Sequence, residues 1–439
     1  MKKKLVESSV KHNISEQQSN FKEHIGLRFY IVLIIWLSWA LTQSLSMLKI
    51  MPSSYTQILW YLKNPLGVLV VIVCTVLYLE DLKISQTAIL SLLFCFYAIS
   101  NVLVKECTLT NLYQQAMYFL WAWCFFVIAP SFLSSTVRLL IFLRSIFWGT
   151  IAILFVGIIG SIVFGIPLSE STWASAMSRM RYTFGFRHPG YIATIVFSLI
   201  LMAWSLRLLS SEQKEKIIMS FVMIVGIIML YLTASRTSLI SLLFIIVVAA
   251  LLNSGIRFSS FIALSYLGLI FLVSIFFIAL LKYPNPWYLF NKISSNRIII
   301  WANSIWCNVT NNPWSFIWGG EQATLRSVSS LSGENGSTIT SVFGRYRLDS
   351  VYVDMFLMFG VIGLILFVFI FIWLLKSLIR KRKDLEMNNK KIYSFIIAVV
   401  IGILVTSISA SWIPSMGNLI NISILPIILA IHYNHLFVD

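Results

Sequence analysis

Eight arginines of the chain beyond Gly165 have a chemistry that suits the binding of an anion. A planar guanidinium donates two parallel hydrogen bonds to phosphate oxygens, a geometry that the ammonium group of lysine does not reproduce. Such a set of side chains predicts a phosphate-binding surface if all of them face the same side. The arginines in question are Arg179, Arg181, Arg187, Arg236, Arg297, Arg326, Arg345 and Arg347.

Two of these arginines lie in short motifs next to apolar runs. Arg187 belongs to Gly-Phe-Arg-His-Pro-Gly, in which Pro189 suits the first turn of a helix and His188 then sits near a helix N-terminus, where an anion is also favoured. Arg236 lies in Ser-Arg-Thr, between two apolar runs that are joined by almost no loop. A membrane-embedded cation is costly unless it is paired, so Arg236 needs a partner, which is either a lipid phosphate or the phosphate of a specific ligand.

The one long polar interval, 282–349, holds the remaining candidates. Its residues 291–307 mix Ile and Trp with Lys292 and Arg297, which predicts an amphipathic helix on the membrane surface. Residues 327–344 are rich in Ser, Gly and Thr, as is typical of a mobile lid. The interval closes on Arg-Tyr-Arg-Leu-Asp, in which Asp349 either caps the next helix or serves, beside Arg345 and Arg347, as a catalytic carboxylate.

The composition requires that these segments be positioned by a membrane protein. Apolar residues make up 59% of the chain and charged residues 11%, against roughly 25% charged in a soluble globule. The apolar runs have the length of membrane-crossing helices and lack the period of two that barrel strands show. We therefore expect an all-α polytopic membrane protein with about twelve transmembrane helices, at 27–48, 58–79, 84–104, 112–131, 142–165, 189–209, 217–234, 237–254, 258–281, 350–375, 392–410 and 417–433.

The distribution of basic residues predicts the orientation. The 376–391 loop carries seven lysines and arginines, so it should be cytoplasmic. Counting the membrane spans outward from this loop places both termini in the cytoplasm. Residues 1–26 then form a cytoplasmic leader, which precedes spans one to nine (27–281). The large loop 282–349, between spans nine and ten, then faces out, ahead of the last spans in 350–439. All eight arginines named at the outset fall on the outer side, where orientation alone does not call for them.

Several function classes are disfavoured. The net charge of +17 lies mostly beside apolar runs, so it serves orientation rather than nucleic-acid binding. No pair of outer carboxylates has the spacing of a metal site, so we expect neither a metal nor another cofactor. The five cysteines form no metal motif, although a Cys107–Cys307 bridge is compatible with two loops in an oxidising compartment.

The order of these motifs resembles that of a known family. A tight Ser-Arg-Thr hairpin at Arg236, the upstream motif around Arg187 and a long outer loop before a span with Tyr352 and Gly360 resemble the O-antigen ligase and polymerase superfamily. The resemblance covers residues 150–380. Within the superfamily the chain is most similar to Wzy-type polymerases of capsular, O-antigen or exopolysaccharide repeat units.

The resemblance implies a metal-independent glycosyltransferase in the bacterial cell membrane. Its donor would be an undecaprenyl-diphosphate-linked oligosaccharide at the outer face, and a flippase and a chain-length regulator of the same pathway would be its partners. It implies that Arg187 and Arg236 bind the donor diphosphate, and we expect Arg297, Arg345 and Arg347 to assist. Ligases carry a His-Asn pair before the tyrosine-bearing helix, with the histidine as proposed base. Here that position reads Asp349-Ser350, which leaves Asp349 and His188 as candidate bases.

Two other functions stay open. A ligase would move finished glycan to a different acceptor, by the same chemistry. A lipid-linked oligosaccharide flippase or other transporter would be expected to show repeated halves and charges near the midplane. The sequence has no internal repeat that we can detect, and its unusual charges gather at one face.

Overall fold

The computed structural model describes residues 26–82, 84–105, 109–171, 180–254, 297–320, 350–408 and 418–434. Its secondary structure is almost entirely helical, which confirms the all-α prediction. Ten of the described helices are long and apolar enough to cross a membrane, and α18 (Leu419–Tyr433) is a shorter apolar helix. The protein is therefore a multi-pass membrane protein, and the predicted span at 258–281 lies outside the described residues.

Helices occupy eleven of the twelve predicted spans, with ends that differ from the predicted ones by up to eight residues. The first half contains α2 (Leu27–Leu45), α3 (Ser53–Leu77), α4 (Gln86–Lys105), α5 (Leu109–Ala122) with its continuation through the π-helical η2 (Trp123–Ile128) into α6 (Ala129–Phe132), and α7 (Thr136–Val163). Then follow α8 (Pro189–Leu209), α9 (Gln213–Leu232), α10 (Arg236–Asn253), α16 (Val351–Lys383), α17 (Met387–Thr406) and α18. Between α7 and α8 lies a two-stranded antiparallel sheet of β1 (Ser169–Ser171) and β2 (Met180–Tyr182).

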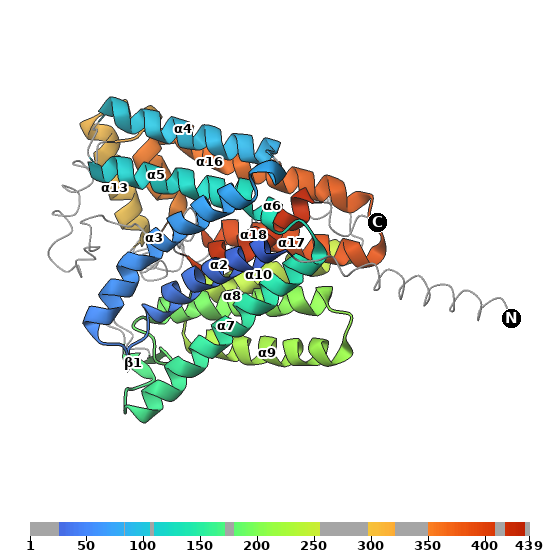
Figure 1. Cartoon of the computed structure of the whole chain (residues 1–439). Coiled ribbons are helices and arrows are strands. Elements are labelled where there is room, and N and C mark those ends of the chain that lie inside the picture. The colour runs from blue at the N-terminus through green and yellow to red at the C-terminus, as the bar shows by residue number, and fades with distance from the viewer. Residues whose placement is uncertain are drawn as a thin grey trace, which may run out of the picture.

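The most deeply buried helices are α8 and α18. Figure 1 shows them in the middle of the bundle, with α4, α5 and α16 along one side and α7 and α9 along the other. Every residue of α18 from Leu419 to His432 is buried. Its backbone is tied to α2 by the Trp36 indole, whose Nε1 donates to the Ile422 carbonyl at 3.0 Å. The buried residues include the polar Asn421 and Ser423, which are costly to expose to lipid, and this favours a central position for α18.

One end of the bundle, which we call the Arg382 end, gathers helix C-termini around basic side chains. Arg382 donates to the Leu252 carbonyl at the end of α10 and, from Nε, to the Ser394 hydroxyl of α17 at 2.7 Å. Lys381 donates to the His432 carbonyl in α18. These bonds satisfy carbonyl groups that the last turn of a helix leaves without partners.

The same end contains the described turns that the basic residues assign to the cytoplasm. Asn434, just after α18, donates to the Leu133 carbonyl between α6 and α7 at 3.1 Å. An ion pair of 2.7 Å joins Arg144 in α7 to Glu215 in the first turn of α9. The turns expected to share one face of the membrane thus share one end of the bundle.

Helix α16 is interrupted at Gly360, where φ is +66° and ψ is −168°. The break turns backbone groups toward neighbours: the Gly320 amide donates to the Leu357 carbonyl at 2.8 Å, and the Tyr97 hydroxyl to the Phe359 carbonyl at 2.8 Å. A Cβ at Gly360 would lie 2.1 Å from the Ile317 carbonyl oxygen. Glycine at this position therefore lets the short helix α14 (Ser315–Trp318) pack against the broken helix.

We predict that Gly360→Ala destabilises the fold by more than about 3 kcal/mol, because the backbone conformation is restricted to glycine and the added Cβ overlaps a carbonyl. Gly165→Ala is the matched control: its φ is +64°, but nothing lies within 4 Å of a Cβ there. It should cost only about 1–2 kcal/mol. Thermal unfolding of both variants in detergent would measure the difference, and equal losses would contradict the steric role of Gly360.

Candidate functional site

The opposite end of the bundle, which we call the Arg236 end, joins the α2–α3, α7–α8 and α9–α10 turns. The first contact is between residues 47–51 and 183–187. The Lys49 amide donates to the Gly185 carbonyl at 2.8 Å, and the Arg187 amide donates to the Met47 carbonyl at 2.8 Å. The Lys49 ammonium reaches the Thr183 hydroxyl at 3.1 Å. Two turns that are far apart in sequence thus form one surface.

Arg187 lies on this surface and is oriented by backbone carbonyls. Its Nε donates to the Leu48 carbonyl at 3.4 Å, and Nη2 to the Met51 carbonyl at 3.0 Å. A guanidinium carries more N–H donors than these two bonds use. The side chain is exposed and contacts no carboxylate in the described part of the chain. Arg187 is therefore held in place while its charge stays available to an anion.

His188 is the N-cap of α8, as its position before Pro189 predicts. Its Nδ1 accepts a hydrogen bond from the Gly190 amide at 3.0 Å. A ring nitrogen that accepts a hydrogen bond carries no proton, so the neutral ring bears its proton on Nε2. In this arrangement His188 presents an N–H donor, and it has no free lone pair with which to act as a base.

Arg236 is the first residue of α10, directly after the three-residue turn 233–235. Its side chain is exposed and forms no hydrogen bond or ion pair with the residues that the structure describes. The unsatisfied amides of the first helical turn add positive potential at the same place. The tight hairpin predicted from Ser-Arg-Thr is thus present, and it presents both a guanidinium and a helix N-terminus.

The turn that carries Arg236 is tied to β2. Arg181 donates from Nε to the Thr233 carbonyl at 3.0 Å. Arg181 is only two residues from Thr183, which contacts Lys49, so a continuous set of contacts links the α2–α3 turn through β2 to the start of α10. The structure brings Arg187 and Arg236 to the same end of the bundle.

The start of α16 belongs to the same end. The Ser241 hydroxyl of α10 bonds the Thr406 hydroxyl at the end of α17, and the Val351 amide donates to the Ser407 carbonyl at 3.0 Å. Ser350 caps α16, since its hydroxyl accepts from the Val353 amide at 3.4 Å. Ser350, rather than the preceding Asp349, thus provides the side-chain cap of this helix.

The remaining sequence candidates are described only in part. Helix α13 (Arg297–Asn311) lies in the segment for which an amphipathic helix is predicted, but of Arg297 only the backbone is described. Cys307 is likewise described only by its backbone. Arg345, Arg347, Asp349, Cys107 and the predicted lid at 327–344 lie outside the described residues.

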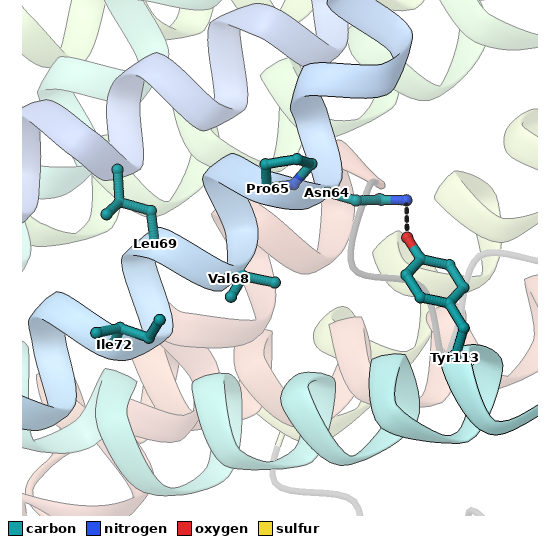
Figure 2. A pocket seen from close by; sticks show the side chains of 6 residues that line it. All are labelled: Asn64, Pro65, Val68, Leu69, Ile72 and Tyr113. Atoms are coloured by element: carbon teal, nitrogen blue, oxygen red, sulfur yellow. Dashed lines mark hydrogen bonds between the residues drawn. The ribbon is translucent and has the colours of Figure 1, made fainter. Parts of the chain in front are cut away.

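An apolar groove lies on the lipid-facing side, between α3 and α5. Figure 2 shows Pro65, Val68, Leu69 and Ile72 along α3, with the Asn64 amide donating to the Tyr113 hydroxyl of α5 at 2.7 Å. The groove encloses about 350 Å³. It contains no charged side chain, so it is not part of the cationic surface.

Comparison with protein families agrees with this geometry. Residues 221–368 match the family model of the O-antigen ligases. This segment is therefore similar to the O-antigen ligase and polymerase superfamily. It includes Arg236, α13 and the start of α16, while Arg187 lies before it. No curated protein matches the chain significantly. The match supports an enzyme that transfers glycans within a membrane.

Sequence reasoning missed Arg181 and Lys49 as parts of the site. Arg181 is one of the eight arginines expected on one side, with no partner assigned, and Lys49 is not among the site residues expected from the sequence. Their partners, Thr233 and Thr183, lie 52 and 134 residues away along the chain. No local pattern in the sequence reports contacts of that range.

We predict that His188→Ala lowers stability by about 1 kcal/mol and that His188→Asn does not, because asparagine replaces the capping acceptor. Glycan transfer should survive in His188→Asn. Thermal unfolding and a transfer assay on the same preparations would measure both. A folded His188→Asn protein without transfer activity would instead identify the imidazole as a catalytic group.

Proposed function

We propose that the protein polymerises undecaprenyl-diphosphate-linked oligosaccharide repeat units for a capsule, O-antigen or exopolysaccharide. It works in the bacterial cell membrane with both termini cytoplasmic and the Arg236 end outside. The observation that supports the proposal is the pair of exposed guanidinium groups, Arg187 and Arg236, at one end of a bundle whose 221–368 segment matches O-antigen ligases.

The two arginines suit a lipid diphosphate for complementary reasons. Arg187 is already oriented by two carbonyls, so binding an anion costs it little conformational entropy. Arg236 adds its charge to the N-terminus of α10, where an anion is favoured. The two phosphate groups of a diphosphate have enough oxygens to accept two parallel hydrogen bonds from each guanidinium. In the proposal Arg297, Arg345 and Arg347 assist from the large loop.

The reaction that we propose transfers the growing glycan to a hydroxyl of the incoming repeat unit. The hydroxyl oxygen bonds to the anomeric carbon while the bond from that carbon to the diphosphate oxygen breaks. Undecaprenyl diphosphate leaves with the bonding electron pair, and the fixed arginines stabilise the charge that develops on it. The reaction needs no metal when guanidinium groups carry out this role.

A base must accept the proton of the attacking hydroxyl, and we assign that role to Asp349. Ser350 provides the side-chain cap of α16. A capping role is therefore not needed to explain the aspartate at position 349. In the sequence Asp349 directly precedes the start of α16, which is bonded to the end of α17, and α17 is in turn bonded to α10 near the Arg236 end. A carboxylate within hydrogen-bond reach of the hydroxyl supplies general base catalysis. The cap formed by His188 makes the imidazole the weaker candidate.

The family match favours one second candidate, since its description is that of a ligase. A ligase would use the same lipid diphosphate but deliver finished glycan to another acceptor. The cationic surface serves both reactions equally, so the intermediates that accumulate without the protein must distinguish them.

We predict that a strain lacking this protein accumulates single repeat units on undecaprenyl diphosphate at the outer leaflet. Extraction and mass analysis of the lipid-linked glycans, with a strain complemented by the wild-type gene as control, would measure this. Finished lipid-linked polymer would identify a ligase instead. Intermediates confined to the cytoplasmic leaflet would identify a flippase and contradict the proposal.

We also predict that Asp349→Asn reduces polymerisation by about 10²-fold or more, because the amide cannot accept the proton, while binding of the lipid diphosphate persists. Purified lipid-linked repeat units give a direct assay. Asp384→Asn, in the loop at the other end of α16, is the matched control and should retain full activity. Undiminished polymerisation by Asp349→Asn would remove the residue from the mechanism.

A further inference from the structure

The turn from which Arg236 extends is not stabilised by its own residues alone. Ala234 has a φ of +53°, a left-handed conformation that costs an L-residue roughly 1–2 kcal/mol. Ser235, the residue before α10, makes no side-chain cap to the helix. The Thr233 hydroxyl donates to the Leu230 carbonyl at 2.7 Å and accepts from the Ser235 amide at 3.4 Å, and the Ser235 hydroxyl bonds the Ser238 hydroxyl at 2.9 Å. These local bonds leave the Thr233 carbonyl to a partner from outside the turn.

Arg181 supplies that contact. Its Nε donates to the Thr233 carbonyl at 3.0 Å, and a hydrogen bond from a charged donor is stronger than one between neutral groups. Because Thr233 is fully buried, its carbonyl has little access to water as an alternative partner. The bond thus fixes the backbone three residues before Arg236.

The strand that carries Arg181 is held by its pairing with β1 and by contacts of the residues that follow it. It pairs with β1, with Arg181 opposite Glu170 in the register. The next residues anchor it further, since the Thr183 amide donates to the Leu168 carbonyl at 2.7 Å and its hydroxyl accepts from Lys49 at 3.1 Å. Through Lys49 and Gly185 the same segment contacts the turn that orients Arg187. Arg181 therefore connects the supports of both anion-binding candidates.

We propose that Arg181 is a positioning residue of the diphosphate site, which acts by fixing the 233–235 turn so that the Arg236 guanidinium meets the anion. The inference rests on the proposed function. It adds to that function a residue whose contribution passes through Arg236 rather than through its own contact with the donor. A substitution of Arg181 should then weaken diphosphate binding only while Arg236 is present.

A double-mutant cycle tests this dependence. The full chain is purified as wild type, Arg181→Gln, Arg236→Gln and the double variant, and each is titrated with undecaprenyl diphosphate in nanodiscs. Arg181→Gln should weaken binding about tenfold in the wild-type background and less than about twofold when Arg236 is already replaced, a coupling typical of residues that act together. Ala234→Gly, which relieves the left-handed strain, should restore part of the affinity that Arg181→Gln loses.

The control is Arg207→Gln, an exposed arginine in the last turn of α8 at the Arg382 end, which should bind as the wild type does. Equal losses from Arg181→Gln in both backgrounds would overturn the inference while leaving the proposed function intact. Wild-type affinity in Arg236→Gln would contradict the anion site itself, and the inference with it. If Arg181→Gln does not fold, Arg181→Lys takes its place in the same cycle with the same criteria.

Discussion

Hydrogen bonds from guanidinium groups to backbone carbonyls hold the Arg236 end together. Arg187 bonds the α2–α3 turn and Arg181 bonds the α9–α10 turn, so segments separated by more than a hundred residues form one surface. At a membrane boundary a carbonyl that lacks a partner is costly, as is an arginine that lacks one. Each bond relieves both costs, which explains why arginine is used to join the turns.

Both ends of the bundle combine arginines that are bonded within the protein with arginines that are exposed. At the Arg382 end, Arg144 pairs with Glu215, and Arg382 is occupied by a carbonyl and a hydroxyl of neighbouring helices. At the Arg236 end, Arg187 and Arg236 are exposed and meet no carboxylate among the described residues. Positive charge that the protein does not itself neutralise is available to an external anion. Arg207 and Arg380 are exposed at the Arg382 end as well, so the family match of the segment that carries Arg236 is what connects the Arg236 end to the proposed reaction.

Local features of the site could be predicted, because short-range chemistry determines them. Pro189 fixes the start of α8 and thereby makes His188 the cap, and the absence of a loop between two apolar runs places Arg236 at a helix start. The approximate positions of the helices followed from the length of the apolar runs. The long-range contacts could not be predicted, since nothing near Arg181 indicates Thr233. Serine and aspartate are comparable N-caps, so the sequence could not decide between Ser350 and Asp349. The break in α16 at Gly360 also could not be predicted, because it depends on the long-range contact with Ile317.

The proposed reaction requires that the Arg236 end face away from the cytosol, because the lipid-linked donor is presented at the outer face of the membrane. Single cysteines at Ser54 and Ser211 give a matched pair, since both positions are exposed and lie at opposite ends of the bundle. Intact spheroplasts are treated with a membrane-impermeant thiol reagent, and the labelled peptide is located by mass spectrometry. We expect labelling at position 54 and protection at position 211 until the cells are opened. Labelling of position 211 with protection of position 54 would place the cationic surface in the cytosol and contradict the proposed reaction.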